Sequence, residues 1–338
     1  MDFVDWSISV QIPIIYLTIC ISIPSMALYI AEIVTIVRHK KFHNPFYALF
    51  VMRAIPDLLY VLNSFYGQRL PFIIGAVLYP IYSNLPNWML AMYYFIVGHT
   101  FFANYLVTAF ILLNRLTAII KPIKHEKIWI KLLPFITIFV YVVPTLLFLP
   151  VFKMNATIQM HDPNSTSERN FVIYEAGDAP MINYLGYIGT AFSVIFSILC
   201  VLLNICTFVA YKLHMKKVSI NGNNNFDDIK KKLLFYAFAT FLGHALVASL
   251  LMINIITKDD WKTKFMIFVY YPLMLDTGTV VLSSWLLLWA SGTFRQQLIK
   301  DFAIIRIRNN RVDAMGGPQN NNHRAVGGAV GDQYLLNT

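Results

Sequence analysis

Charged residues are scarce in this chain. Asp, Glu, Lys and Arg make up 13% of its 338 residues, and hydrophobic residues make up 57%. An ordinary soluble domain contains about 25% charged residues. A soluble fold of this composition would expose large apolar patches, which soluble monomers avoid. The composition therefore excludes disordered, collagen-like and coiled-coil chains, argues against a soluble enzyme, and indicates a membrane protein.

Cysteines and catalytic motifs are scarce as well. Cys20, Cys200 and Cys206 all lie inside apolar runs, so they provide neither a disulfide framework for outer loops nor the paired spacing of a zinc site. The segment from His125 begins like the HExxH zinc motif but has Trp129 in place of its second histidine. The GxSxG, P-loop and GxGxxG patterns are absent. We therefore expect no enzyme activity, no metal site and no cofactor.

Long apolar runs are what the chain does contain. A helix that crosses a bilayer needs about 20 mostly apolar residues, and seven runs qualify. They are residues 12–37, 46–68, 88–113, 128–152, 181–211, 233–256 and 265–292. The runs lack the short alternating strands of a membrane β-barrel. The sequence thus predicts an all-α membrane protein, with a seven-transmembrane helix bundle over residues 12–292.

The distribution of basic residues predicts the orientation of these spans. With seven spans and the N-terminus outside, twenty Lys and Arg residues lie in inner segments and six, including Arg69, in outer ones. This split obeys the positive-inside rule, so the net charge of +10 reflects topology rather than nucleic-acid binding. An eighth span at residues 70–82 would break the rule. That apolar segment is also too short to span, and we interpret it as an outer loop or a shallow re-entrant segment.

The segments outside the spans fit the same orientation. Acidic residues 2 and 5 precede the first run and basic residues follow it, so we expect residues 1–11 to be an extracellular N-terminus rather than a signal peptide. Glycosylation sequons at Asn155 and Asn164 fall in an outer loop. Residues 293–308 have the spacing of an amphipathic helix on the inner membrane surface, an eighth helix. Residues 309–338 are rich in Asn and Gly, and we expect a disordered cytoplasmic tail.

Ionisable residues within the apolar runs mark candidate sites, because each is costly in a bilayer. Arg53 and Asp57 are four residues apart on one helix face, and Glu32 lies at a similar depth on the preceding run. We predict a Glu32–Arg53–Asp57 cluster, which serves either switching or simple mutual neutralisation. Asp57 and Asp276 both lie near the bilayer centre. They either share a polar site, a cation or a proton, or are unrelated solvated carboxylates.

Aromatic and histidine side chains form the candidate ligand site, because pockets in helix bundles are mostly apolar and aromatic with a few polar groups. The candidates lie in the outer halves of the spans or near the middle: Tyr93, Tyr94, Phe95, His99, Tyr184, Tyr187, His244, Tyr270, Tyr271 and Asp276. The alternative is that the tyrosines form the interfacial belt common in membrane proteins and that the histidines are packing residues.

Two short motifs carry a family resemblance. The inner end of the third run reads Leu113-Asn114-Arg115, followed by Ala118-Ile119-Ile120, Pro122 and Ile128-Trp129, and the second run begins Asn44-Pro45-Phe46-Tyr47. Together with seven spans and a following helix, this pattern resembles the nematode serpentine chemoreceptors of the Srg superfamily, most closely the Srg and Srv classes. The resemblance covers residues 10–300, approximately.

The resemblance implies a G-protein-coupled receptor of the plasma membrane, on sensory-neuron cilia. Such a receptor binds a small-molecule ligand and signals through a heterotrimeric G protein. Asn114 and Arg115 then lie where the G protein docks, although Arg115 also fits a simple topology anchor. Lys216, Lys217 and Lys231 flank the third inner loop, where they either face an acidic partner or only follow the positive-inside rule.

The chain also departs from the larger rhodopsin-like family. It has Asn114-Arg115-Leu116 where that family has Asp/Glu-Arg-Tyr, it lacks Asn-Pro-x-x-Tyr in the last run, and it lacks the cysteine pair that joins the third span to the second outer loop. The alternative function is a ligand-gated channel or transporter of the plasma membrane. A transporter of this kind is typically built from repeated halves, and the sequence contains no internal repeat.

Overall fold

The computed structural model describes residues 11–160, 170–178, 180–218, 270–271 and 273–302, together with parts of 235–253. Six of the described helices are long and apolar enough to cross a membrane. Their candidate spans are Pro13–Arg38, Pro45–Ile73, Asn87–Ile120, Pro122–Lys153, Pro180–Leu213 and Leu273–Ala290. The run predicted at 233–256 contains a shorter apolar helix, Phe241–Leu250, and the rest of that run lies partly outside the described residues.

The elements follow one another along the chain with short connections. In order they are α2 (Gln11–Arg38), η1 (Lys40–Phe42), α3 (Pro45–Ser64), η2 (Phe65–Arg69), α4 (Leu70–Ile73), α5 (Gly75–Tyr82), α6 (Asn87–Ile120), α7 (Pro122–Phe148), η3 (Leu149–Lys153), β1 (Ala156–Met160), β2 (Phe171–Glu175), α8 (Pro180–Val218), η4 (Thr277–Val281) and α11 (Leu282–Ala290). Residues 292–302 are also helical.

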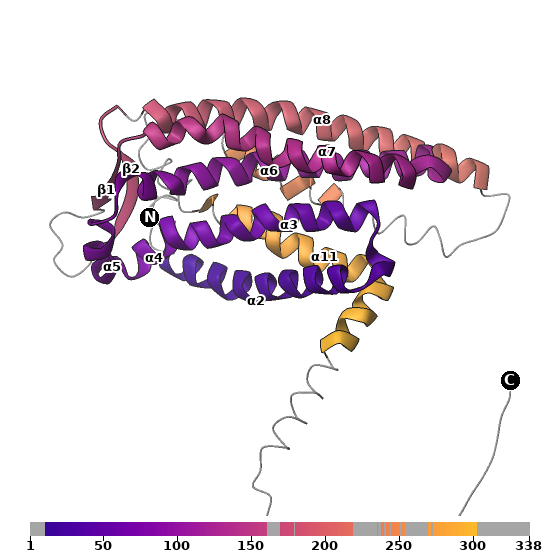
Figure 1. Ribbon diagram of the computed structural model, residues 1–338, viewed down its shortest axis with the longest axis horizontal. Helices are drawn as coiled ribbons and strands as arrows, with labels where there is room; N and C mark the ends of the chain where they lie inside the picture. The colour runs from indigo at the N-terminus through magenta and orange to yellow at the C-terminus, as the bar shows by residue number, and fades with distance from the viewer. Residues whose placement is uncertain are drawn as a thin grey trace, which may run out of the picture.

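The long helices form a bundle in which α2, α3, α6, α7 and α8 alternate in direction (Figure 1). The β1–β2 hairpin, α4 and α5 lie at one end, which we call the hairpin end. The connection η1 and the helical residues 292–302 lie at the other end, which we call the η1 end. The helix that carries η4 and α11 runs in the same direction as α8 and packs against α2.

Capping and proline positions set the helix boundaries. Asn44 caps α3, because its side-chain oxygen accepts hydrogen bonds from the backbone N–H groups of Phe46 and Tyr47 at 3.1 and 3.2 Å. Helix α6 ends at Ile120 because Pro122, the first residue of α7, disfavours helical geometry at Lys121. Helix α6 extends past the predicted end at 113, and α7 begins before the predicted start at 128. A helix continues past its apolar run wherever its charged side chains can reach water.

Two spans contain a π-helical turn, an uncommon feature that often occurs at functional sites. One is η2, which continues α3 toward the hairpin end, and the other is η4 in the last span. A Cβ atom at Gly67 in η2 would overlap the Tyr93 ring of α6, so only glycine permits this packing. Gly278 in η4 packs against the backbone of Gly243. A Cβ atom added at Gly243 would lie 3.0 Å from the Cα atom of Gly278, so the two backbones are in close contact.

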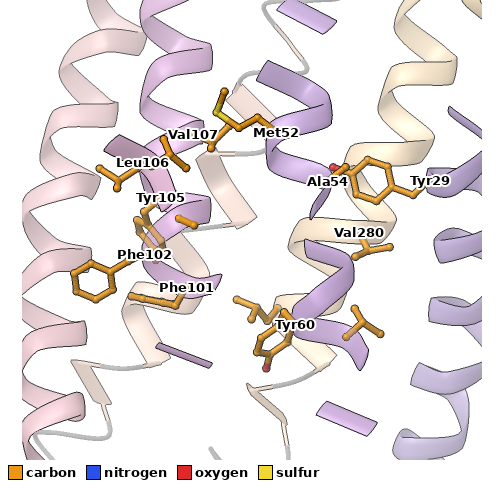
Figure 2. Packing of buried hydrophobic residues seen from close by; sticks show 14 of the residues in the cluster. Tyr29, Met52, Ala54, Tyr60, Phe101, Phe102, Tyr105, Leu106, Val107 and Val280 are labelled. Atoms are coloured by element: carbon orange, nitrogen blue, oxygen red, sulfur yellow. The ribbon is translucent and has the colours of Figure 1, made fainter. Parts of the chain in front are cut away.

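The hydrophobic core lies between α3, α6 and their neighbours. Figure 2 shows buried members of this core: Phe101, Phe102 and Tyr105 of α6, Tyr60 of α3 and Val280 of η4. The Phe102 ring stacks on Phe192 of α8 at 3.8 Å between centroids. Because α6 contacts α3, α7 and α8, it is the central helix of the bundle.

The hairpin pairs β1 and β2 antiparallel, with Ala156 opposite Glu175. Asn87, the first residue of α6, anchors it with two bonds: its side chain donates to the Met154 carbonyl at 2.8 Å and accepts from the Ala156 N–H at 2.7 Å. The Tyr94 hydroxyl, also on α6, donates to the Ile173 carbonyl at 2.7 Å. The hairpin is therefore held to α6 by hydrogen bonds.

The segment 70–82, for which the sequence predicts an outer loop or a re-entrant segment, is helical in α4 and α5. Span two continues through Ile73. Helix α5 has eight residues, about 12 Å of helix, which is too short to cross a bilayer. Its last residue, Tyr82, packs against Phe171 of β2 at 5.1 Å between ring centroids, so α5 belongs to the hairpin end.

The Asn87 anchor predicts a stability effect. Asn87→Ala removes two hydrogen bonds to the hairpin, each worth about 1 kcal/mol, and we expect a lower Tm in thermal unfolding of the purified protein in detergent. Asn84→Ala is the matched control, because the Asn84 side chain is exposed and donates to the Pro80 carbonyl in its own segment. Equal Tm values for the two variants would show that the hairpin is held in another way.

Candidate functional site

A buried ion pair joins the hairpin-end halves of three helices. Arg69, the last residue of η2, donates from Nη2 to Oδ2 of Asp276, the residue that precedes η4. The Ser22 hydroxyl of α2 donates to the same oxygen at 2.7 Å. Arg69 and Asp276 are 3% and 1% exposed, so each charge depends on the other for stability in this apolar setting.

The sequence places Arg69 in an outer segment just after the second apolar run, whereas the structure includes it in the second candidate span. The π turn keeps the helix of span two continuous past residue 68, and it directs Arg69 into the bundle, where Asp276 neutralises it. The Cζ atom of Arg69 also lies 4.8 Å from the centroid of the Phe65 ring. A signal for this site was present in the sequence, because Asp276 is an acidic residue in an apolar run and needs a basic partner.

Buried tyrosines lie in the neighbourhood of the Arg69–Asp276 pair. The Tyr60 hydroxyl lies within electrostatic reach of both charged residues and of Tyr93 and Tyr271. Tyr60 and Tyr93 are 2% and 5% exposed. We call these five residues the tyrosine layer. It combines apolar ring surface with a few fixed polar groups, which is the composition of a small-molecule site.

A second ion pair lies deeper in the bundle, and it confirms part of a predicted cluster. Arg53 Nε is 3.5 Å from Asp57 Oδ2 on α3, and both side chains are fully buried. The Tyr29 hydroxyl of α2 donates to the same oxygen at 3.0 Å. Glu32 does not join them: it is buried, and within the described residues neither of its carboxyl oxygens has a hydrogen-bond partner.

Asp57 and Asp276 have separate partners: each carboxylate has its own arginine and its own hydroxyl donor. Both carboxylates are buried, and each is neutralised within its own pair.

The other predicted ligand residues divide into three groups. Tyr94 lies beside the tyrosine layer, with its ring 4.9 Å from that of Tyr93. Phe95 and His99 face α7 and η3: His99 Nε2 is 3.3 Å from the Tyr141 carbonyl, and Phe95 packs on Phe152.

The remaining candidates are two exposed tyrosines of α8, Tyr270 and His244. Tyr184 and Tyr187 are 38% and 51% exposed on α8, and Tyr270 is part-buried just ahead of Tyr271. His244 lies outside the described residues. The contacts of His99 fit the alternative interpretation, in which it is a packing residue.

At the η1 end, two bonds fasten α6 to α7. The Asn114 side chain bonds His125 Nε2 at 3.1 Å, and the Trp129 indole N–H donates to the Thr117 hydroxyl at 2.8 Å. Arg115 lies between the two attached residues along α6, and its guanidinium covers the Phe46 ring of α3, 3.7 Å from the centroid.

The helical residues 292–302 dock on η1. His39 Nε2 is 2.9 Å from Asp301 Oδ2, and Lys41 donates to the Gln297 side chain at 2.7 Å. Partial burial would raise the pKa of Asp301, but hydrogen bonds from Gln297, His39 and Thr35 outweigh it and lower the pKa below its ordinary value. Sequence analysis did not identify this contact, although Asp301 is the one acidic residue in a basic segment. Lys231 and the side chains of Lys216 and Lys217 lie outside the described part.

The Arg69–Asp276 pair predicts a rescue. Arg69→Met leaves Asp276 buried without its partner, which costs about 3–5 kcal/mol, so we expect little folded protein. Arg69→Met with Asp276→Leu removes both charges and should restore folding, because an apolar pair of similar volume is tolerated.

Fluorescence-detected size-exclusion of tagged protein measures the folded fraction. Arg295→Met is the control, because Arg295 is exposed on residues 292–302. A double variant no better than Arg69→Met alone would contradict the pairing.

Comparisons with known proteins identify the family. The model of the Srg family chemoreceptors matches residues 15–298. Serpentine receptor class gamma-16 of Caenorhabditis elegans is 32% identical over 107 residues, which is 30% of this chain and 33% of that protein. Serpentine receptor class gamma-9 of the same organism is 28% identical over 115 residues, 33% of this chain and 34% of that protein.

The aligned segments span about a third of each of these two relatives, whereas the family model covers nearly all of the helical bundle. The match begins within α2 and ends within the helical residues 292–302, so it contains both buried ion pairs and Arg115. The chain is a multi-pass membrane protein that belongs to the Srg family of chemoreceptors.

Proposed function

We propose that this chain is a seven-helix chemosensory receptor that binds a small molecule in the hairpin-end half of the bundle and signals through a heterotrimeric G protein. The observation that carries the ligand site is the tyrosine layer: a buried ion pair in electrostatic reach of Tyr60, with Tyr93 beside Tyr94, which bonds the hairpin. The family match supports the receptor role.

Helix directions support seven spans. Helix α8 ends at the η1 end, and the helix containing η4 and α11 begins at the hairpin end. A seventh span would return the chain between these two ends. Helix Phe241–Leu250 fits this return, because its Gly243 contacts Gly278 of the last span. Residues 12–292 then form the bundle, with residues 293–308 as an amphipathic eighth helix and 309–338 as a cytoplasmic tail.

The orientation follows from the ends of the bundle. The η1 end contains Arg38, Lys40 and Lys41, and the positive-inside rule puts such residues in the cytoplasm. The hairpin end and residues 1–11 are then extracellular. The receptor acts in the plasma membrane, on the cilia of sensory neurons, as the family resemblance implies.

Binding changes the population of two bundle arrangements if the ligand has different affinity for them. The tyrosine layer includes Arg69, the last residue of η2, and Asp276, the residue before η4. Gly278 of η4 in turn contacts the backbone of Gly243. A ligand that alters the Arg69–Asp276 contact therefore acts next to the place where Gly243 of helix Phe241–Leu250 meets Gly278 of the last span. At the cytoplasmic end, Arg115 meets the G protein.

A functional screen tests the ligand site and the coupling role together. Cells that express the chain and a calcium indicator are exposed to panels of odorants and pheromones. For an active compound, we expect Tyr60→Phe and Tyr271→Phe to raise the half-maximal concentration about tenfold, the loss of one hydrogen bond in a buried site. Exposed Tyr184→Phe is the matched control. Equal potency in all three variants would place the ligand elsewhere.

A separate variant tests the proposed contact between Arg115 and the G protein. Arg115→Ala should abolish the response while surface expression, measured by antibody staining of an N-terminal tag, is kept. A full response from Arg115→Ala would contradict this role. A whole-cell current that persists with G-protein signalling blocked would instead identify a channel.

Glycosylation tests the orientation. Asn155 is exposed at the start of the hairpin, and both Asn155 and Asn164 should carry glycans if the hairpin end is extracellular. Endoglycosidase should increase the electrophoretic mobility of the wild-type protein. Asn155→Gln with Asn164→Gln should run at the deglycosylated position without treatment. Resistance of the wild-type protein to the enzyme would argue against the proposed topology.

A further inference from the structure

The guanidinium of Arg115 lies on the face of a buried aromatic ring. Its Cζ atom is 3.7 Å from the Phe46 ring centroid, well within the range of a cation–π contact. Phe46 is 8% exposed and its ring packs against Tyr47 at 5.3 Å between centroids. Burial therefore fixes the ring on which the cation lies.

Both sides of this contact are rigid. On α3, the Asn44 cap fixes the first turn, and the Tyr47 hydroxyl is 3.3 Å from Ser291 Oγ. On α6, Asn114 and Thr117 are bonded to α7. Consecutive helix residues are rotated by about 100°, so fixing Asn114 toward α7 directs Arg115 toward α3.

The contact buries part of the guanidinium. Arg115 as a whole is partly exposed, but its Nε and Nη2 atoms are buried. In this arrangement the side chain therefore lies along α3 and offers only part of its charge to a partner at the η1 end.

We propose that Phe46 is a positioning residue: its ring holds the guanidinium of Arg115 against α3 and so keeps it away from the cytoplasmic partner. We call this Phe46–Arg115 contact the latch. The regulatory meaning rests on the proposed coupling role of Arg115, whereas the latch itself is a property of the bundle. A cation–π contact changes the ratio of held to released Arg115 by roughly two- to thirtyfold. Such a latch sets the basal level of coupling and can be released by a modest rearrangement.

Graded fluorination of the ring tests the latch with little change in packing. Fluorine withdraws charge from the ring face and weakens a cation–π contact, so we place mono-, di- and trifluorophenylalanine at position 46 of the full-length receptor. The accessibility of Arg115 is measured in purified protein as its rate of modification by phenylglyoxal, followed by mass spectrometry. Exposed Arg38 and Arg295 and fully buried Arg53 are internal references.

We expect the rate at Arg115 to rise stepwise with fluorine number, by two- to thirtyfold in the trifluoro protein, roughly. The same series at Phe50 is the matched control, because that fully buried ring is one turn along α3 and packs edge-on against Tyr29 at 5.2 Å. It should leave the Arg115 rate unchanged. Rates that do not depend on fluorine number at position 46, or that rise equally at position 50, would overturn the latch.

Basal G-protein activation in the same proteins separates the latch from the coupling role. Faster modification with higher basal activation supports both. Faster modification with unchanged activation supports the latch and contradicts the proposed role of Arg115. Phe46→Leu provides a genetic version of the test, and the fluorinated series decides the outcome if that variant does not fold.

Discussion

A charge buried among apolar helices is costly unless a partner neutralises it, and this constraint shapes the bundle around Arg69 and Asp276. Arg69 is neutralised by Asp276, and Ser22 bonds the same carboxylate, so one site joins α2, η2 and the last span. These contacts connect residues more than 200 positions apart in the chain. A buried pair adds little net stability compared with apolar residues, but it strongly penalises arrangements that separate its members. The pair therefore specifies which helices adjoin.

Helix α6 connects the two ends that matter for the proposed mechanism. Its first residues hold the hairpin through Asn87 and Tyr94, and its last turns are fastened to α7 and carry Arg115. The helix is continuous over 34 residues. A displacement at the tyrosine layer can thus reach the latch through one rigid element, with no chain of small side-chain movements in between.

Sequence reasoning succeeded where the signal was local. Apolar runs located six described spans, and the spacing of Arg53 and Asp57 predicted their contact. It failed where the outcome depended on a distant partner. Arg69 stands just after the second apolar run, and its partner Asp276 lies more than 200 residues away in the chain. The end of α6 and the start of α7 differ from the predicted runs because hydropathy reports the apolar region, whereas Pro122 determines where one helix stops and the next starts.

The attachment of the hairpin has a consequence of a different kind. Rhodopsin-like receptors fix the corresponding loop with a cysteine pair, whereas the three cysteines here are free thiols inside the helices. Asn87 and Tyr94 supply side-chain bonds in that place. Attachment of the loop then requires no oxidative folding step and resists reductants. Such bonds also break and re-form far faster than a disulfide exchanges, so the hairpin is attached to α6 by reversible contacts.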